Sequence, residues 1–256
     1  CIRDRDKLGL NLPGLQEELL ETVTAVGKPV VLVISAGSAL DLSWADAHVA
    51  AIIDSFYPGA RGGKAVAEAI FGDFSPSGKL PVTFYQGTEN LPEFTDYDMS
   101  DRTYRYTDKN VLYPFGYGLH YGTIRYENAQ ISCAQCSVRD AVDVSVDVIN
   151  ESSYTIHESV QAYIQHEEAD AYEPGYQLKG IQTVTLQPKE TKRVTISLKA
   201  RDFAIITQEG ECVVRPGSYR IAIGGQQPDA RSAKLTGSDV AALVVRREGA
   251  QTPVEY

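Results

Sequence analysis

Val142-Asp143-Val144-Ser145-Val146-Asp147-Val148-Ile149-Asn150 is the stretch that decides the fold of the second half of the chain. Valine occupies every second position up to residue 148, which is the period of a β-strand with one buried face. Turn residues recur downstream, as at Pro188-Lys189-Glu190 and Arg215-Pro216-Gly217-Ser218. Short strands separated by such turns predict an antiparallel β-sandwich. The further expected strands cover residues 160–164, 184–186, 194–198 and 219–223, with an edge strand over 241–245.

The first half of the chain alternates helix-like and strand-like segments. Residues 15–26 carry Leu and Val at spacings of three and four, which predicts an amphipathic helix. Residues 30–34 form an apolar, mostly β-branched run, which is typical of a parallel strand covered on both faces. A complete three-layer α/β domain needs more strands than this half supplies, and we expect the missing ones to lie before Cys1. The other expected elements are a short helix over 45–49, a buried strand over 51–56 and a helix over 64–71.

Between the two halves, residues 73–123 lose regular periodicity and are rich in Gly, Pro, Asp and Tyr. Such a stretch is typical of functional loops that pack on a domain. The predicted fold class is therefore α/β followed by all-β: a partial three-layer α/β sandwich plus a fibronectin III-like β-sandwich. The expected divisions are residues 1–121 for the C-terminal portion of the α/β domain with its tyrosine-rich linker loop, 122–247 for the β-sandwich, and 248–256 for a tail.

Composition and charge exclude several classes of function. The chain has 256 residues and a formal net charge of -10, which argues against nucleic-acid binding because phosphate recognition needs clustered Lys and Arg. No stretch approaches the roughly 20 apolar residues of a membrane helix, so no membrane partner is expected. Neutral substrates such as sugars stay open, since their recognition depends on hydrogen bonds and aromatic faces.

The ends and the cysteines bear on the cellular compartment. The chain begins with Cys1 and has no charged-then-apolar secretory pattern, so we expect the native start to be missing. Its four cysteines are too few for a disulfide-built scaffold in a chain that can bury proper cores. We expect reduced thiols and a cytoplasmic location, in a bacterial cell.

Three motifs point to chemistry at first sight and fail on closer reading. Residues 59–64 (GARGGK) have three residues before the Gly-Lys pair where a phosphate loop needs four, and Ala65 follows in place of Ser or Thr. We predict a tight strand-to-helix turn there instead. Cys133 and Cys136 lack two further ligands at zinc spacing, and no Gly-x-Ser-x-Gly elbow accompanies the histidines. We expect no metal and no cofactor.

Asp101-Arg102-Thr103-Tyr104-Arg105-Tyr106 leaves two interpretations open. In an extended segment, alternation would place Tyr104 and Tyr106 on one side and the two arginines on the other. The arginines could serve structural pairing with an acidic surface. The alternative is a binding-site rim formed by Arg102, Tyr104 and Arg105.

The order of several segments carries a resemblance that none of them carries singly. Residues 4–7 (DRDK), 10–16 (LNLPGLQ), 57–67 (YPGARGGKAVA), 71–83 (FGDFSPSGKLPVT), 102–106 (RTYRY) and 112–121 (LYPFGYGLHY) follow one another along the chain. This succession closely resembles glycoside hydrolase family 3, the β-glucosidases and β-xylosidases. Residues 177–180, 188–191 and 214–219 resemble the C-terminal fibronectin-like domain of that family.

The resemblance implies a retaining enzyme whose two catalytic groups lie in different domains. A retaining mechanism needs two carboxyl groups about 5 to 5.5 Å apart. By the resemblance, the nucleophilic Asp belongs to an N-terminal barrel absent from this chain, and the acid/base Glu lies just upstream of Cys1. Neither Asp4 nor Asp6 takes over that role, so no catalytic residue is assigned within the chain. His120 stands where many relatives have Ser or Thr, which puts nothing catalytic in doubt.

Two functions follow as hypotheses. In the first, the chain is the C-terminal segment of a retaining exo-β-glycosidase, inactive alone, whose partners are the barrel portion of the same enzyme and a β-linked oligosaccharide or β-glycoside. Its α/β part should expose apolar surface and associate, with a homo-oligomer as one outcome. In the second, it is a free-standing carbohydrate- or protein-binding module. The single tryptophan, Trp44, lies in the α/β half and not in the sandwich, which favours the first hypothesis.

Overall fold

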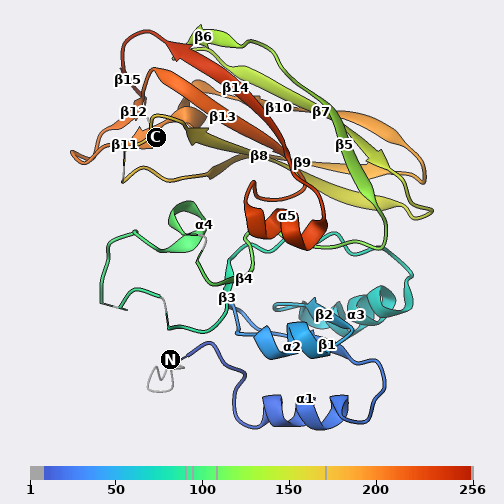
Figure 1. The fold of residues 1–256 in the computed structure, drawn as a ribbon. Coiled ribbons are helices and arrows are strands. Elements are labelled where there is room, and N and C mark those ends of the chain that lie inside the picture. The colour runs from blue at the N-terminus through green and yellow to red at the C-terminus, as the bar shows by residue number, and fades with distance from the viewer. Residues whose placement is uncertain (1–8, 90, 94, 108, 171, 255–256) are drawn as a thin grey trace.

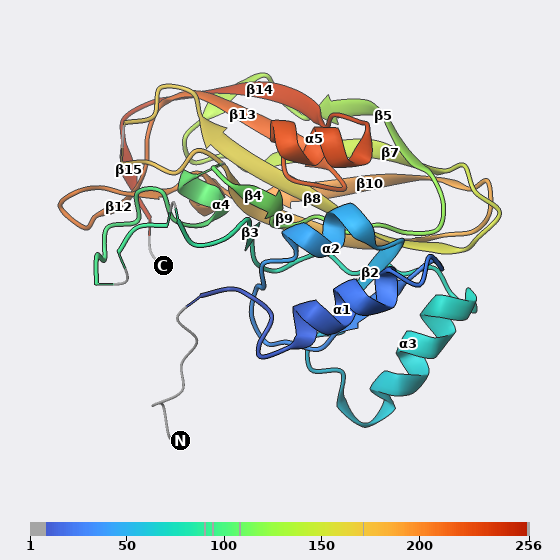
Figure 2. The same ribbon diagram turned by 60° about the horizontal axis from the view of Figure 1, so that its bottom comes forward.

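The computed structural model describes residues 9–89, 91–93, 95–107, 109–170 and 172–254. Figure 1 shows an α/β part below a β-sandwich, with the linker between them. Figure 2, in which the bottom of the molecule comes forward, shows α1, α2 and α3 of the α/β part below the sandwich. The predicted class, α/β followed by all-β, is confirmed.

The α/β part has the predicted order of helices and strands. Its two strands pair in parallel, with Leu32 opposite Ile52. A small core beneath them includes Leu20, Ile34 and Phe84, so the linker contributes to it as well. The elements are α1 (Gln16–Thr24), β1 (Val31–Ile34), α2 (Ser43–His48), β2 (Ala51–Asp54), η1 (Gly59–Arg61) and α3 (Gly62–Phe71).

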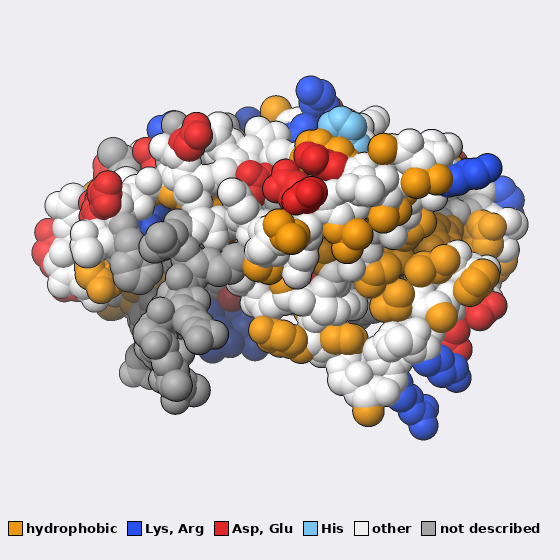
Figure 3. All heavy atoms as spheres, turned by 90° about the horizontal axis from the view of Figure 1, so that it is seen from below, with side chains coloured by type: hydrophobic (Ala, Val, Ile, Leu, Met, Phe, Trp, Pro, Cys, Tyr) orange, Lys and Arg blue, Asp and Glu red, His pale blue; other side chains and the backbone are white. Residues whose placement is uncertain are grey.

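The expectation that the first strand is covered on both faces is wrong for the part of the chain that the structure describes. Val31 and Val33 are exposed, because strand alternation points both to a face that no described element covers. In α1 only Leu20 is buried, while Leu15 and Leu19 are exposed. Figure 3 shows hydrophobic side chains gathered over α1 and α3 on this face of the molecule.

The glycine-rich segment before α3 forms the predicted tight turn. Gly59 has a φ of +66°, in the left-handed region that favours glycine. A Cβ on Gly62 would lie 2.5 Å from the Cβ of Pro58, so only glycine lets the chain approach itself there.

The linker forms a hairpin-like pair and one helical turn. These elements are β3 (Phe84–Tyr85), α4 (Thr103–Tyr106) and β4 (Val111–Tyr113), with β3 antiparallel to β4. The prediction of an extended segment at 101–106 is wrong, because Thr103–Tyr106 closes a helical turn after the extended Arg102. Contacts with the sandwich, described below, hold this turn.

The sandwich packs a three-stranded sheet against a five-stranded one. Their orders are β10-β7-β5 and β6-β14-β13-β8-β9, and a small third sheet has the order β11-β12-β15. The four valines of the deciding stretch, Val142, Val144, Val146 and Val148, are fully buried in the core between the sheets. The strands are β5 (Ile124–Ile131), β6 (Gln135–Ser137), β7 (Val142–Asn150), β8 (Ile156–His166), β9 (Gln177–Leu186), β10 (Thr191–Leu198), β11 (Ile205–Ile206), β12 (Cys212–Val214), β13 (Gly217–Gly224), β14 (Ala241–Glu248) and β15 (Thr252–Pro253), with η2 (Ala200–Phe203) and α5 (Ala230–Thr236) between them.

Two details at the C-terminal end differ from the expected elements. Residues 241–245 pair with β13 alone, as expected of an edge strand, but β14 continues to Glu248, and β6 pairs in parallel with its last three residues. Thr252 and Pro253, within the expected tail, form β15 and pair with β12. The chain therefore remains part of the sandwich past residue 248. The division near residue 122 stays a prediction.

A buried ionic cluster joins the linker to the sandwich. Glu158 of β8 contacts Lys79 Nζ at 3.1 Å and His120 Nε2 at 3.2 Å, both from the linker. Burial opposes ionisation of Glu158, but the hydrogen bond with His120 and the Lys79 charge outweigh it and hold the pKa of Glu158 below its ordinary value. Gln161 donates to the carbonyl of Gly116 nearby, so this junction is polar.

Candidate substrate rim

Arg102, the first predicted rim residue, organises the loop that precedes α4. Its guanidinium donates to three backbone carbonyls, those of Glu93 and Asp96 at 2.7 Å and that of Asp98 at 3.1 Å. It therefore pairs with main chain and not with the acidic side chains of the surface. These bonds tie Arg102 to Glu93, Asp96 and Asp98 in the described part of the loop.

Tyr104, the second rim residue, anchors α4 on the sandwich. Its ring stacks on Phe115, with centroids 4.1 Å apart and planes 7° from parallel, and meets the edge of Tyr163. Its hydroxyl accepts a hydrogen bond from the Leu178 amide at 3.1 Å. Tyr104 is thus positioned by residues far away in sequence.

Arg105, the third rim residue, reaches the same stretch of the sandwich. Its Nη2 donates to Gln177 Oε1 and its carbonyl accepts from the Gly175 amide, both at 2.7 Å. Its Nε is buried and has no hydrogen-bond partner among the described residues. Tyr104 and Arg105 thus contact the same stretch of the sandwich, and of the three rim residues Arg105 alone lines a pocket between α4 and the sandwich.

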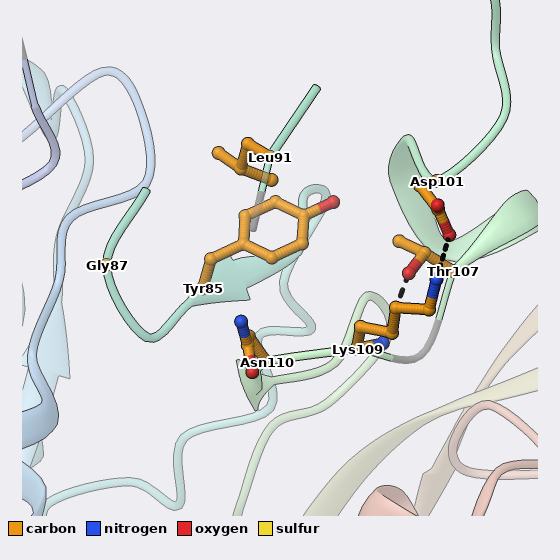
Figure 4. A pocket seen from close by; sticks show the side chains of 7 residues that line it. All are labelled: Tyr85, Gly87, Leu91, Asp101, Thr107, Lys109 and Asn110. Carbon is orange, nitrogen blue, oxygen red and sulfur yellow. Dashed lines mark hydrogen bonds and ion pairs between the residues drawn. The ribbon is translucent and has the colours of Figure 1, made fainter. Parts of the chain in front are cut away.

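A shallow depression lies beside the linker hairpin. Figure 4 shows Tyr85, Leu91 and Lys109 on its walls, with Lys109 bound to Asp101. The Lys109–Asp101 ion pair measures 2.9 Å, and burial raises the pKa of Tyr85 above its ordinary value. The depression encloses no measurable volume, so it could form one wall of a site but not a site by itself.

A second pocket, of about 360 Å³, lies between α4 and the sandwich. This volume falls at the lower end of the range for small-ligand pockets. Its walls come from α4, the start of β9, η2, β11 and β12, and Val254 beyond β15. The polar lining residues are Arg105, Tyr106, Tyr172, Gln177, Lys179, Arg201 and Asp202.

No sequence pattern singles out Lys179, Tyr172 or Arg201 as site residues. Residues 177–180 appeared only as part of the family resemblance. Gln177 and Lys179 both line the pocket and are two residues apart, which is the spacing of one strand face. The pairing of β9 with β8 skips Lys179 between Leu178 and Gly180, so regular alternation is interrupted there. No sequence pattern could have predicted that Gln177 and Lys179 lie close to Arg105, which is more than 70 residues away in the sequence.

The other expectations about the site concern metals and membranes. Among the described residues, no group of three or more His, Cys, Asp or Glu is placed to hold a metal ion. Cys133 and Cys136 are free thiols, and burial together with the neighbouring Cys133 raises the pKa of Cys136 to about 11. No helix within the described ranges has the length and apolar character needed to span a membrane.

Comparison with known proteins bears on the whole chain. Residues 3–121 match the glycosyl hydrolase family 3 C-terminal domain, and residues 158–227 match a fibronectin type III-like domain. The chain belongs to glycoside hydrolase family 3. The resemblance on the quoted motifs is confirmed, and it covers both halves.

Individual relatives extend across both domains of this family 3 chain. A β-xylosidase of Formosa agariphila is 34% identical over 243 residues, which cover 92% of this chain and 34% of the relative. A periplasmic β-glucosidase of Salmonella typhimurium is 32% identical over 85% of this chain and 30% of its own length. A β-glucosidase structure from Erythrobacter marinus superposes with a TM-score of 0.80 and 34% identity, over 95% of this chain and 31% of that one. The chain thus spans about a third of the length of these relatives.

Proposed function

We propose that the chain acts as the C-terminal segment of a retaining exo-β-glycosidase that removes terminal β-linked glucose or xylose. The observation that supports this most is the continuous match of both domains to β-xylosidases and β-glucosidases. On this proposal the nucleophilic Asp resides in a barrel portion, which corresponds to the length of the relatives that this chain does not match.

The chemistry explains why this segment would not act alone. A retaining glycosidase forms and hydrolyses a glycosyl-enzyme intermediate with one carboxylate as nucleophile and one carboxylic acid as acid/base. We place both outside the described residues, the acid/base Glu next to the start of the α/β part. The segment then contributes position and shape: the loop held by Arg102, together with Tyr104 and Arg105, borders the sugar site.

A complementation experiment tests this proposal. The chain alone should not hydrolyse p-nitrophenyl β-D-glucoside or β-D-xyloside. Addition of the separately expressed preceding portion of a family 3 relative, from its barrel through the segment that corresponds to the residues just before Cys1, supplies both carboxyl groups and should restore turnover. Enzyme-like turnover by the repurified chain alone would refute the proposal. Saturable binding of oligosaccharide without any turnover in the reconstituted mixture would favour the alternative, a free-standing binding module.

A further inference from the structure

The 360 Å³ pocket between α4 and the sandwich carries more positive than negative charge. Arg105, Lys179 and Arg201 line it, whereas Asp202 is the one acidic residue among its described lining residues. The Asp202 carboxylate already accepts a hydrogen bond from the Lys199 amide at 2.7 Å. The whole chain, by contrast, has 34 acidic and 24 basic residues, so this local excess runs against its overall charge.

The cations of the pocket are only partly paired: Arg105 donates from Nη2 to Gln177 but leaves its Nε without an acceptor among the described residues. Lys179 is half-buried, and within the described part of the chain it makes no hydrogen bond or ion pair, although the Asp202 charge nearby favours its protonated form. Burial lowers the pKa of Lys179, and the nearby Arg105 charge lowers it further. Arg105 adds a buried Nε that donates to no described acceptor. Half-buried charges without partners destabilise a fold, which suggests that a bound anion completes the arrangement.

The remaining lining fits a sugar ring. Tyr106 and Tyr172 supply aromatic surface and hydroxyl groups, Gln177 supplies an amide, and Ile205 supplies an apolar wall. Pockets that bind small ligands combine such apolar walls with a few convergent polar groups. The volume suits one pyranose unit and not an extended chain.

We propose that this pocket binds a carboxylated pyranose, a hexuronic acid unit, with its carboxylate directed at Arg105 and Lys179. A planar carboxylate matches the guanidinium geometry of Arg105, and Lys179 adds a second charge. The pocket is formed by this chain alone, so its occupancy does not depend on the proposed hydrolysis.

The test is a set of titrations of the full chain at constant ionic strength, followed by NMR or calorimetry. The probes are sodium D-glucuronate, D-glucose as its uncharged counterpart, and inorganic phosphate. Glucuronate should bind saturably and at least about tenfold more tightly than glucose, the factor expected for one charge-assisted hydrogen bond. Equal affinity for glucose and glucuronate, tighter binding of phosphate, or no glucuronate binding would each overturn the proposal.

Matched variants locate the binding. Lys179→Met keeps the aliphatic stem but removes the charge, and should weaken glucuronate binding about tenfold without lowering the melting temperature. Arg105→Gln should weaken it similarly, with circular dichroism to confirm the fold. Lys234→Met removes an exposed charge from α5, outside the pocket, and should bind as the unmodified chain does. Unchanged affinity in folded Lys179→Met would overturn the assignment.

Discussion

Glu158→Gln is the substitution that most directly tests how the two domains are joined. The Glu158 side chain is 1% exposed and ion-pairs with Lys79 and His120, which are 14% and 15% exposed. One of its oxygens also accepts from the Ser159 amide at 2.9 Å. A glutamine keeps the shape but removes the charge, so Lys79 stays in a nearly buried position without its counterion.

The expected cost follows from this burial. Removal of one partner of a buried ion pair costs about 3 to 5 kcal/mol. Lys79 retains slight exposure and also donates to the Gly118 carbonyl at 3.2 Å, so we expect the lower end, about 3 kcal/mol. For a chain of this size, that corresponds to a melting temperature lower by about 6 to 12 °C.

Thermal and urea unfolding measure this effect, with Glu127→Gln as the control. Glu127 is exposed and contacts the exposed Arg125, so its loss should cost under about 1 kcal/mol. If Glu158→Gln is no more destabilising than the control, the buried cluster does not hold the junction. Lys79→Met in the Glu158→Gln background should recover part of the loss, because it removes the stranded charge.

The same cluster predicts a pH dependence of stability. The pKa of Glu158 is held below its ordinary value of 4.5, so its ionised form stabilises the folded state. That contribution is present in full above pH 4.5 and is lost as the pH falls through the lower folded value. The stability difference between the unmodified chain and Glu158→Gln should therefore shrink below pH 4.5. A difference that stays constant to pH 3 would contradict this assignment.

Four further predictions concern the loop, α4, the sandwich and the exposed face. Arg102→Ala should speed proteolysis between residues 93 and 102 and change global stability little, since it removes only loop contacts. Tyr104→Phe removes the hydrogen bond from the Leu178 amide and should lower the free energy of unfolding by about 1 kcal/mol in thermal unfolding. An unchanged stability would show that this hydrogen bond does not anchor α4. A sandwich made of residues 122–254 should melt above one that ends at 247, because it retains β15. Leu19→Glu should reduce self-association in sedimentation, since Leu19 lies on the exposed apolar face.

The sandwich could be predicted because its pattern encodes burial residue by residue. The valines at 142, 144, 146 and 148 are the buried side of β7, as their alternation requires. The coverage of β1 could not be predicted in the same way. Its apolar run indicates that both faces favour burial, but whether a neighbour covers them depends on elements elsewhere.

The candidate site could not be predicted from local sequence pattern, for a similar reason. α4 is one helical turn, and Tyr104 and Arg105 find their partners 74 and 72 residues downstream. No period within residues 101–106 contains this information. The pocket likewise depends on β9, η2 and β12 meeting α4, so its surplus charge becomes visible only in three dimensions.

These long-range contacts make the sandwich part of the proposed site even though it carries no assigned catalytic group. The Tyr104 hydroxyl, the Arg105 guanidinium and the Arg105 carbonyl all meet residues 175–178. If the loop borders the sugar, a substitution at Gln177 alters substrate binding by shifting Arg105, although Gln177 itself does not contact the substrate. The fibronectin III-like domain would then be retained for the precision with which it holds the linker. On that view its own folding stability and the geometry of the sugar site are coupled through one short stretch of β9.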